Sequence, residues 1–383
     1  MKTKHQMRQV ATFALGLFFF ASPLFASAAT TAVKPGPFPD GMSTWYGSVY
    51  NTSSQHDDKL QVGGWGDEYD SLVRFNLSAL PVTATQAVVW LYAYPRGDAS
   101  TPVNIEWYRN TTQWHTGSVS WSTKPSGNDL GYTNAPTTIP GWYGVDFTSL
   151  YNSWRSGSSP NYGLALKPLA NNNRFDMFRG SGYTADTTLR PELDVTYNTS
   201  GTDSIPHFKW PLSSVAYASR SVTQAFGAFP WAGGTECPVG YQKYHNGTDY
   251  STGGVGGATE YAPEDGIVKE VTFDSSGWGY NVVMEHVTPG GGSTYTSVIW
   301  HISPNSDVTA SNPGGFIPKG APLGTVASLT YPKVSHFHFG IRRAAYSYPT
   351  SGAGALPQST CSSYLGYPAS FVDPESSSNV IFN

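Results

Sequence analysis

The six residues 335–340 constrain this chain most strongly, because aromatic rings and imidazoles alternate along them. Successive side chains of a β-strand point to opposite faces, so Phe337 and Phe339 would share one face. His336 and His338 would share the other. Two imidazoles buried side by side require a charged partner or a metal ion. The segment therefore predicts a core strand whose polar face carries a binding or catalytic site.

A second motif, the run from His245 to Asp249, adds an imidazole and a carboxylate four positions apart. These groups suit a borderline ion such as zinc. A set of His, Asp and His leaves one tetrahedral position open for water, which is typical of a catalytic zinc site. Each motif alone is usually accidental. Their combination is more specific, and five of the nine histidines lie from His245 onward.

From about residue 208 the chain resembles the lysostaphin/LytM-type zinc metallopeptidases, the M23 family. Matching blocks occur in the family's order, at residues 208–211 with 223–227, 244–250, 261–268, 277–286, 300–303, 319–324 and 336–339. The resemblance implies an antiparallel-β, lysostaphin/LytM-like catalytic domain with a groove across its sheet.

The resemblance also implies roles for single residues. His245, Asp249 and His338 would bind one zinc ion. His301 and His336 would flank it, one as general base and the other stabilising the oxyanion or protonating the leaving amine. The sequence does not decide between these two roles.

Three further positions qualify the resemblance. His286 is expected to be structural, at the end of a strand. Ile299 and Gly340 stand where the family commonly has Tyr and Glu. Neither position is a metal ligand, so the metal set is unaffected and the substrate contacts are expected to differ. Tyr241 or Tyr244 could supply the missing tyrosine.

The N-terminus predicts export. Lys2, Lys4 and Arg8 precede an apolar run over residues 10–25, and small residues at 26–28 form a cleavage site, so residues 1–28 read as a signal peptide. The mature protein would be soluble and extracellular or cell-wall associated. Export makes a disulfide between Cys237 and Cys361 the expected pairing. A net charge of −4 offers no basic surface for nucleic acid.

The chain is long enough for two domains. Residues 198–206 are polar, small and aperiodic, and read as a linker between domains at 31–197 and 207–383. In the first domain, expected strands lie at residues 60–62, 71–77, 87–94, 103–108, 162–166 and 193–197. A short helix is expected at 147–154, ended by Gly157. The fold class is therefore all-β, with a jelly-roll β-sandwich in front.

This front domain resembles the DNRLRE-type modules, which are akin to carbohydrate-binding modules. The matching text lies at residues 60–64, 71–75, 119–121 and 190–193. Candidate glycan contacts are Trp65, Trp114 and Trp142 together with Arg74, Arg155, Arg174 and Lys167. Tryptophans in a sandwich are more often core residues than sugar platforms.

The sequence thus predicts a secreted zinc metallo-endopeptidase that hydrolyses peptide bonds of bacterial peptidoglycan, with an N-terminal targeting module. It would be a monomer with one Zn²⁺ per chain, acting on peptidoglycan or another extracellular glycan or protein polymer. Three alternatives remain open: a zinc-dependent lyase on an acidic polysaccharide, an endopeptidase on an extracellular Gly-rich protein, and a binding protein with a degenerate site.

Overall fold

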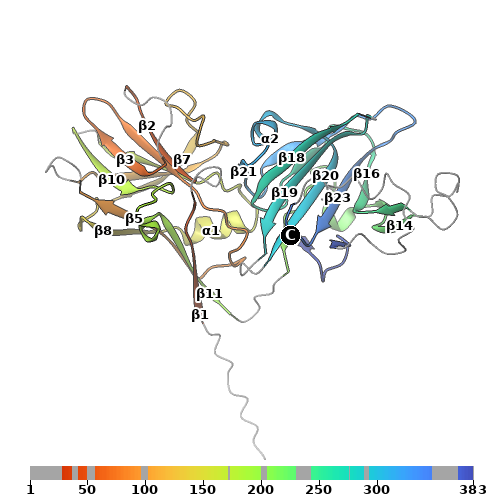
Figure 1. Cartoon of the computed structure of the whole chain (residues 1–383), viewed down its shortest axis with the longest axis horizontal. Helices are drawn as coiled ribbons and strands as arrows, with labels where there is room; N and C mark the ends of the chain where they lie inside the picture. Colours follow the sequence, from red (N-terminus) through yellow and green to blue (C-terminus); the bar gives the residue numbers. More distant parts are fainter. Residues whose placement is uncertain are drawn as a thin grey trace, which may run out of the picture.

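The computed structural model describes residues 28–36, 42–49, 57–95, 102–170, 173–199, 205–229, 243–275, 277–288, 293–346 and 370–382. Two β lobes stand side by side, with β1–β11 and α1 in one and β12–β25 and α2 in the other (Figure 1). Among the described strand pairs, β12 with β25 is parallel and the other pairings are antiparallel. The expected all-β fold class is confirmed.

The front lobe contains eleven strands and one α-helix. These are β1 (Ala28–Val33), β2 (Ser43–Gly47), β3 (Lys59–Gly64), β4 (Tyr69–Val73), β5 (Gln86–Tyr94), β6 (Ile105–Asn110), β7 (Gly127–Thr133), β8 (Gly141–Asp146), α1 (Thr148–Arg155), β9 (Leu164–Pro168), β10 (Arg174–Arg179) and β11 (Glu192–Asn198). The strands follow the order β1-β11-β5-β10-β3-β4-β9-β6-β7, with β2 on β4 and β8 on β5.

Alternation of buried and half-buried residues shows which side chains form the core of this lobe. Along β5, every second residue from Ala87 to Ala93 is buried. These side chains meet those of β3, β6, β9 and β11 in one hydrophobic core. Helix α1 covers it with Tyr151 and Trp154, and the Gly157 N–H bonds to the Trp154 carbonyl at 3.0 Å to end the helix, as predicted.

The rear lobe is built on a ten-stranded sheet. Its elements are β12 (His207–Phe208), β13 (Val222–Gln224), β14 (Gly227–Phe229), β15 (Lys243–His245), β16 (Thr248–Gly254), β17 (Thr259–Tyr261), β18 (Gly266–Asp274), β19 (Gly279–Val287), β20 (Thr294–Pro304), α2 (Ser306–Ala310), β21 (Phe316–Ile317), β22 (Pro322–Val326), β23 (Ser335–Arg342), β24 (Phe371–Val372) and β25 (Ile381–Phe382). The central order is β13-β16-β23-β20-β19-β18-β21. Phe337 and Phe339 of β23 are fully buried in its core.

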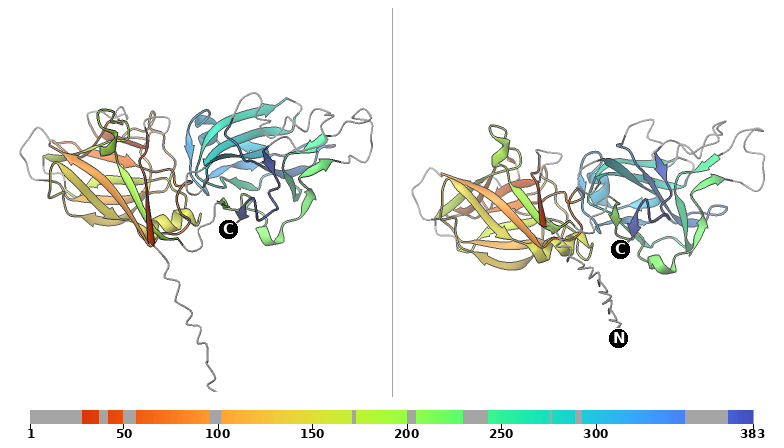
Figure 2. Two further views of the ribbon diagram at one scale, coloured as in Figure 1. Left: turned by 60° about the horizontal axis from the view of Figure 1, so that its bottom comes forward. Right: turned by 90° about the horizontal axis from the view of Figure 1, so that it is seen from below.

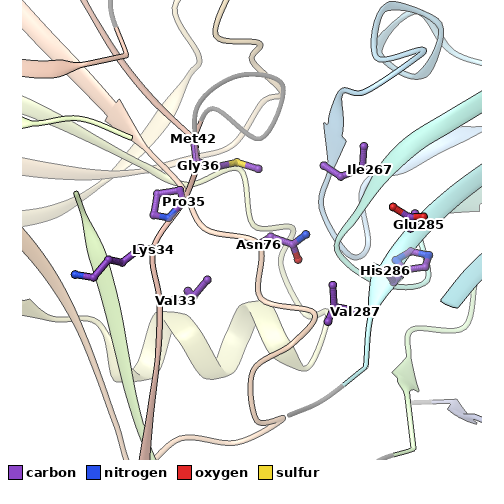
Figure 3. A pocket seen from close by; sticks show the side chains of 10 residues that line it. All are labelled: Val33, Lys34, Pro35, Gly36, Met42, Asn76, Ile267, Glu285, His286 and Val287. Carbon is purple, nitrogen blue, oxygen red and sulfur yellow. The ribbon is translucent and has the colours of Figure 1, made fainter. Parts of the chain in front are cut away.

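The lobes meet beside α1 (Figure 2), and polar side chains form hydrogen bonds and an ion pair between them. Asp265 accepts hydrogen bonds from the Leu77 N–H at 2.9 Å and from the Asn161 amide at 3.2 Å. A cavity of 260 Å³ opens beside this contact, lined from one lobe by Val33 to Gly36, Met42 and Asn76, and from the other by Ile267 and Glu285 to Val287 (Figure 3). The two lobes are therefore joined by direct contacts as well as by the chain between β11 and β12.

Candidate metal centre

Two neighbouring strands bring the predicted metal ligands together. Strand β16 pairs with β23 so that Asp249 lies directly opposite His338. His245 ends β15, one short turn before β16. The His245 Nε2 lies 3.1 Å from Asp249 Oδ1 and 3.2 Å from His338 Nδ1, and His338 Nδ1 lies 2.9 Å from the same carboxylate oxygen. Three potential ligand atoms thus converge on one point.

The donor set fits a zinc ion. Ligands about 2.05 Å from a tetrahedral zinc would be separated by about 3.3 Å, close to the three distances observed. The His245 Nδ1–H donates to the Ala225 carbonyl at 3.0 Å, which leaves the Nε2 lone pair facing the cluster. Among the described residues, this is a group of His and Asp whose ligand atoms all lie within 4.8 Å of one another.

Glycine at position 247 is required by this packing. A Cβ there would lie 2.7 Å from His338 Nε2 and 2.5 Å from the Phe339 carbonyl oxygen. The close approach of the backbone positions the His338 ring, so the glycine between His245 and Asp249 has a steric reason.

The electrostatics favour a neutral His338 beside an ionised Asp249. Burial lowers the pKa of His338 to about 4, although Asp249 opposes this. Burial would raise the pKa of Asp249, but its interactions with His245, His336 and His338 outweigh burial and hold that pKa well below its ordinary range. Neutral imidazole and ionised carboxylate are the forms that bind a metal ion.

His301 reaches the cluster through a β-bulge. Strand β19 pairs Tyr280 with Ile302 and then Asn281 with Trp300, so His301 is an extra residue in β20. Its φ of 64° lies in the left-handed region. A regular strand would direct Trp300 and His301 to opposite faces, but here their rings stack 4.6 Å apart. The bulge therefore turns His301 toward the metal ligands.

His301 and His336 form a second pair beside the ligands, with ring centroids 4.3 Å apart. The His301 Nδ1–H donates to the Trp278 carbonyl at 2.8 Å, and the His336 Nδ1–H donates to the Val334 carbonyl at 2.7 Å. Each ring is thereby held through Nδ1, so Nε2 is the nitrogen that could accept a proton. His336 Nε2 lies 3.5 Å from Asp249 Oδ2. Burial lowers the pKa of His301 well below its ordinary value, and His336 adds to this.

The three positions that qualified the resemblance, His286, Ile299 and Gly340, have structural roles. Both ring nitrogens of buried His286 are bonded, Nδ1 to the Asp265 carbonyl and Nε2 to the Ser297 hydroxyl, each at 2.8 Å. Ile299 is a core residue. A Cβ at Gly340 would lie 2.9 Å from the Asn246 carbonyl oxygen, which explains the absence of a larger residue there.

Several proposed glycan contacts are wrong. Trp114 is buried and donates to the Tyr162 carbonyl at 2.7 Å. Arg74 is buried against the Trp114 ring, and Arg155 is buried in the lobe interface. Trp65 and Trp142 are exposed, while Arg174 and Lys167 are half-buried.

Some sequence predictions fall outside the described residues. They are residues 1–27 of the predicted signal peptide at 1–28, the Cys237–Cys361 disulfide and Tyr241; the side chain of Tyr244 is likewise not described. Within the described part of the chain, neither α-helix has the length and apolarity needed to cross a bilayer.

Comparison with known proteins finds several chains that are similar to parts of this one. The catalytic domain of lysostaphin from Staphylococcus simulans is 19% identical and covers 33% of this chain and 84% of that one, with a TM-score of 0.25. The catalytic domain of the prophage-encoded M23 protein EnpA from Enterococcus faecalis is 20% identical and covers 35% and 88%, with a TM-score of 0.25. The tRNA3(Ser)-specific nuclease WapA from Bacillus spizizenii is 28% identical over 152 residues, or 39% of this chain; the match spans 6% of WapA.

Family comparisons divide the chain in the same way as the two lobes. Residues 43–197 match carbohydrate-binding module family 96. Residues 243–349 match peptidase family M23, and this range contains both histidine pairs and Asp249. The chain thus combines a region of carbohydrate-binding module family 96 with a region of the M23 family of peptidases.

Proposed function

We propose that this protein is a secreted zinc metallo-endopeptidase that cleaves the peptide part of bacterial peptidoglycan. The observation that carries the proposal is the convergence of His245, Asp249 and His338 beside a second pair of oriented imidazoles. A structural zinc site would have four protein ligands and no such pair. The match to peptidase family M23 supports hydrolysis of a peptide bond.

His301 and His336 would transfer the protons of the hydrolysis reaction. Zinc, when bound, would activate a water molecule and polarise the scissile carbonyl. His301 and His336 each hold Nδ1–H on a backbone carbonyl and present Nε2 as a proton acceptor. One imidazole would take the proton of the attacking water. The other, once protonated, would stabilise the oxyanion or protonate the leaving amine.

The front lobe would hold the enzyme at its polymeric substrate. Its match to a carbohydrate-binding module family supports a glycan as the anchoring ligand. Binding to the wall would raise the local concentration of cleavable peptides without altering the chemistry. A wall substrate also agrees with the export that the N-terminal sequence predicts.

One sample of the mature full-length protein tests the proposal. Its zinc content is measured, and it is incubated separately with purified peptidoglycan, an acidic polysaccharide and a Gly-rich matrix protein. One zinc per chain with new amines from peptidoglycan would support the proposal. Ultraviolet-absorbing unsaturated sugars without amines would instead identify a lyase. Amines released only from the matrix protein would identify the other peptidase, and no product from any substrate would favour a binding protein.

A further inference from the structure

The sheet face that carries the metal ligands continues past them in the direction away from His336. Along β23, His336, His338 and Gly340 alternate with the core residues Phe337 and Phe339, so these three positions share one face. His338 lies between the other two, and each is about 7 Å from it, the length of two strand residues. We call the side of His338 on which Gly340 lies the far side of the metal centre.

Neighbouring strands extend the far side with apolar residues. Strands β23, β20 and β19 lie side by side (Figure 1). Gly340 is paired with Val298 of β20, and Val298 is paired with Val283 of β19. Both valines are buried, and they form a small cluster separate from the main core of this lobe. Trp300, two residues after Val298, is paired with His338. The far side is therefore an apolar strip that adjoins the metal ligands.

Tyr346 covers this strip. The chain leaves β23 at Arg342 and folds back over the sheet, so that the Tyr346 ring packs against Val283 and Val298. Gly340, the third residue of the same cross-strand row, has no side chain to compete for this space. The M23 family commonly has Glu at that position, so the cover over the strip is a feature of this chain's own residues.

Hydrogen bonds hold Tyr346 at two points. Its backbone N–H donates to Glu285 Oε2 at 2.7 Å, and its hydroxyl donates to Glu270 Oε2 at 2.8 Å. Glu285 is itself held by Lys269, whose Nζ lies 2.9 Å from Oε1. Hydrogen bonds to carboxylates are stronger than those between neutral groups. The ring is therefore a fixed boundary, because moving it aside would break both bonds and expose the two valines.

A peptide placed over the metal ligands would meet a different boundary on each side. His301 and His336, with ring centroids 4.3 Å apart, stand on one side. The Tyr346 ring stands on the other, over the row of residues about 7 Å from His338. Successive side chains of an extended peptide point in opposite directions. Only one of the two residues that flank the scissile bond would therefore face Tyr346.

We propose that Tyr346 is a specificity-determining residue, which limits the substrate side chain on the far side to one no larger than that of alanine. The inference rests on the peptidase function proposed above and adds the size of one residue beside the scissile bond. A larger side chain directed there would overlap a ring that is fixed by Glu270 and Glu285.

Two series of peptide hydroxamates test the inference, because a hydroxamate binds zinc and thereby fixes the register of the peptide. The varied residue, Gly, Ala or Leu, lies on the N-terminal side of the hydroxamate in one series and on its C-terminal side in the other. Calorimetry on the zinc-loaded, full-length mature protein gives each Kd. In one series Leu should bind about tenfold or more weakly than Ala, the scale on which a site discriminates added methylenes.

Variants assign this preference to the ring. Tyr346→Ala uncovers the strip and should bring the Kd for Leu to within about twofold of that for Ala. Tyr346→Phe keeps the ring and should keep the preference. Tyr346→Leu, which still covers both valines, should give an intermediate preference and guards against a folding defect in the alanine variant. Tyr331→Ala is the matched control, since Tyr331 is 91% exposed in the loop before β23; it should leave the preference unchanged.

Amine release from purified peptidoglycan is measured on the same samples. Equal Kd values within both series, a preference that survives Tyr346→Ala, an equal loss in Tyr331→Ala, or no hydroxamate binding at all would overturn the inference. Selective binding that depends on Tyr346 without any amine release would leave the specificity assignment standing and contradict the peptidase proposal. Amine release without a size preference among the hydroxamates would do the reverse.

Discussion

Arg155 at the end of α1 and Glu264 in the turn before β18 form a buried ion pair, with Nη1 2.6 Å from Oε1. Lys319 approaches the other carboxylate oxygen at 3.6 Å and donates to the His207 carbonyl at 2.5 Å. Burial would raise the Glu264 pKa, but Arg155 and Lys319 outweigh it and lower that pKa. Three charges from distant parts of the sequence thus meet at the lobe interface.

Removing one partner of this pair should destabilise the protein. Arg155→Met leaves the buried Glu264 carboxylate with only Lys319 and the Asp265 backbone N–H as partners, and we expect a loss of about 3–5 kcal/mol in the free energy of unfolding. Lys34→Met, which breaks the half-exposed pair with Glu192, is the control and should cost less than about 1 kcal/mol. Urea unfolding measures both, and equal losses would contradict a special role for the buried pair.

The ligand assignment predicts two classes of variant. His245→Ala, Asp249→Ala and His338→Ala should each lose zinc. His301→Ala and His336→Ala should retain zinc while the turnover rate falls at least ~100-fold, the scale of acid–base contributions. Metal analysis and single-turnover kinetics separate the classes. Zinc loss in His336→Ala with retention in His338→Ala would show that the two histidines of β23 are assigned the wrong way round.

The close contact between Gly247 and the His338 ring can be tested without substituting a predicted metal ligand. Gly247→Ala would place a Cβ 2.7 Å from His338 Nε2. The ring must shift, and we expect zinc affinity to fall about 10-fold or more, as for other changes that misorient a ligand. Gly117→Ala is the control, because a Cβ there meets nothing within 4 Å. Competition with a zinc chelator measures both, and equal affinities would show that the site absorbs the added methyl.

The interface should also respond to pH through Asp265. Burial and the neighbouring Glu264 raise its pKa to about 6 in the folded protein, above the ordinary value near 3.8. Between these pH values the folded state binds more protons than the unfolded state, so the contribution to stability is present at low pH and lost as pH rises through about 6. The full effect is on the order of 3 kcal/mol.

Thermal unfolding between pH 4.5 and 7.5 tests this contribution. Relative to Asp265→Asn, the unsubstituted protein should gain stability as pH falls from 7.5 to 5. Parallel pH profiles would assign the dependence to other groups. Arg155 and Arg74 also face this region, but Glu264 raises the pKa of Arg155 and burial lowers that of Arg74 only to about 9, so both stay charged between pH 4.5 and 7.5.

Much of the fold was predictable from local patterns. The β5 alternation and the Phe147–Trp154 periodicity located their elements to within one residue. Strand β7 was missed because its sequence, GNDLGYT, is polar, glycine-rich and almost wholly exposed. Pairing with β6 defines it, and a partner across the sheet leaves no local signal.

The site was predictable in composition but not in geometry. Motif order and spacing identified both histidine pairs and Asp249, which the structure brings together. The bulge that re-aims His301 was not visible, because strict alternation would oppose Trp300 and His301. The buried state of Trp114, Arg74 and Arg155 depends on packing between distant segments, which composition does not encode.

The buried contacts between the lobes give the molecule a fixed span. Since Arg155, Asn161 and Leu77 of one lobe bind Glu264 and Asp265 of the other, the two lobes cannot swing independently. If the front lobe anchors the protein and the rear lobe cleaves, as proposed, the histidine cluster reaches only bonds at a set distance from the point of attachment. Digestion of an ordered wall would then yield fragments of preferred size, whereas a loosely tethered pair of domains would cut at scattered positions.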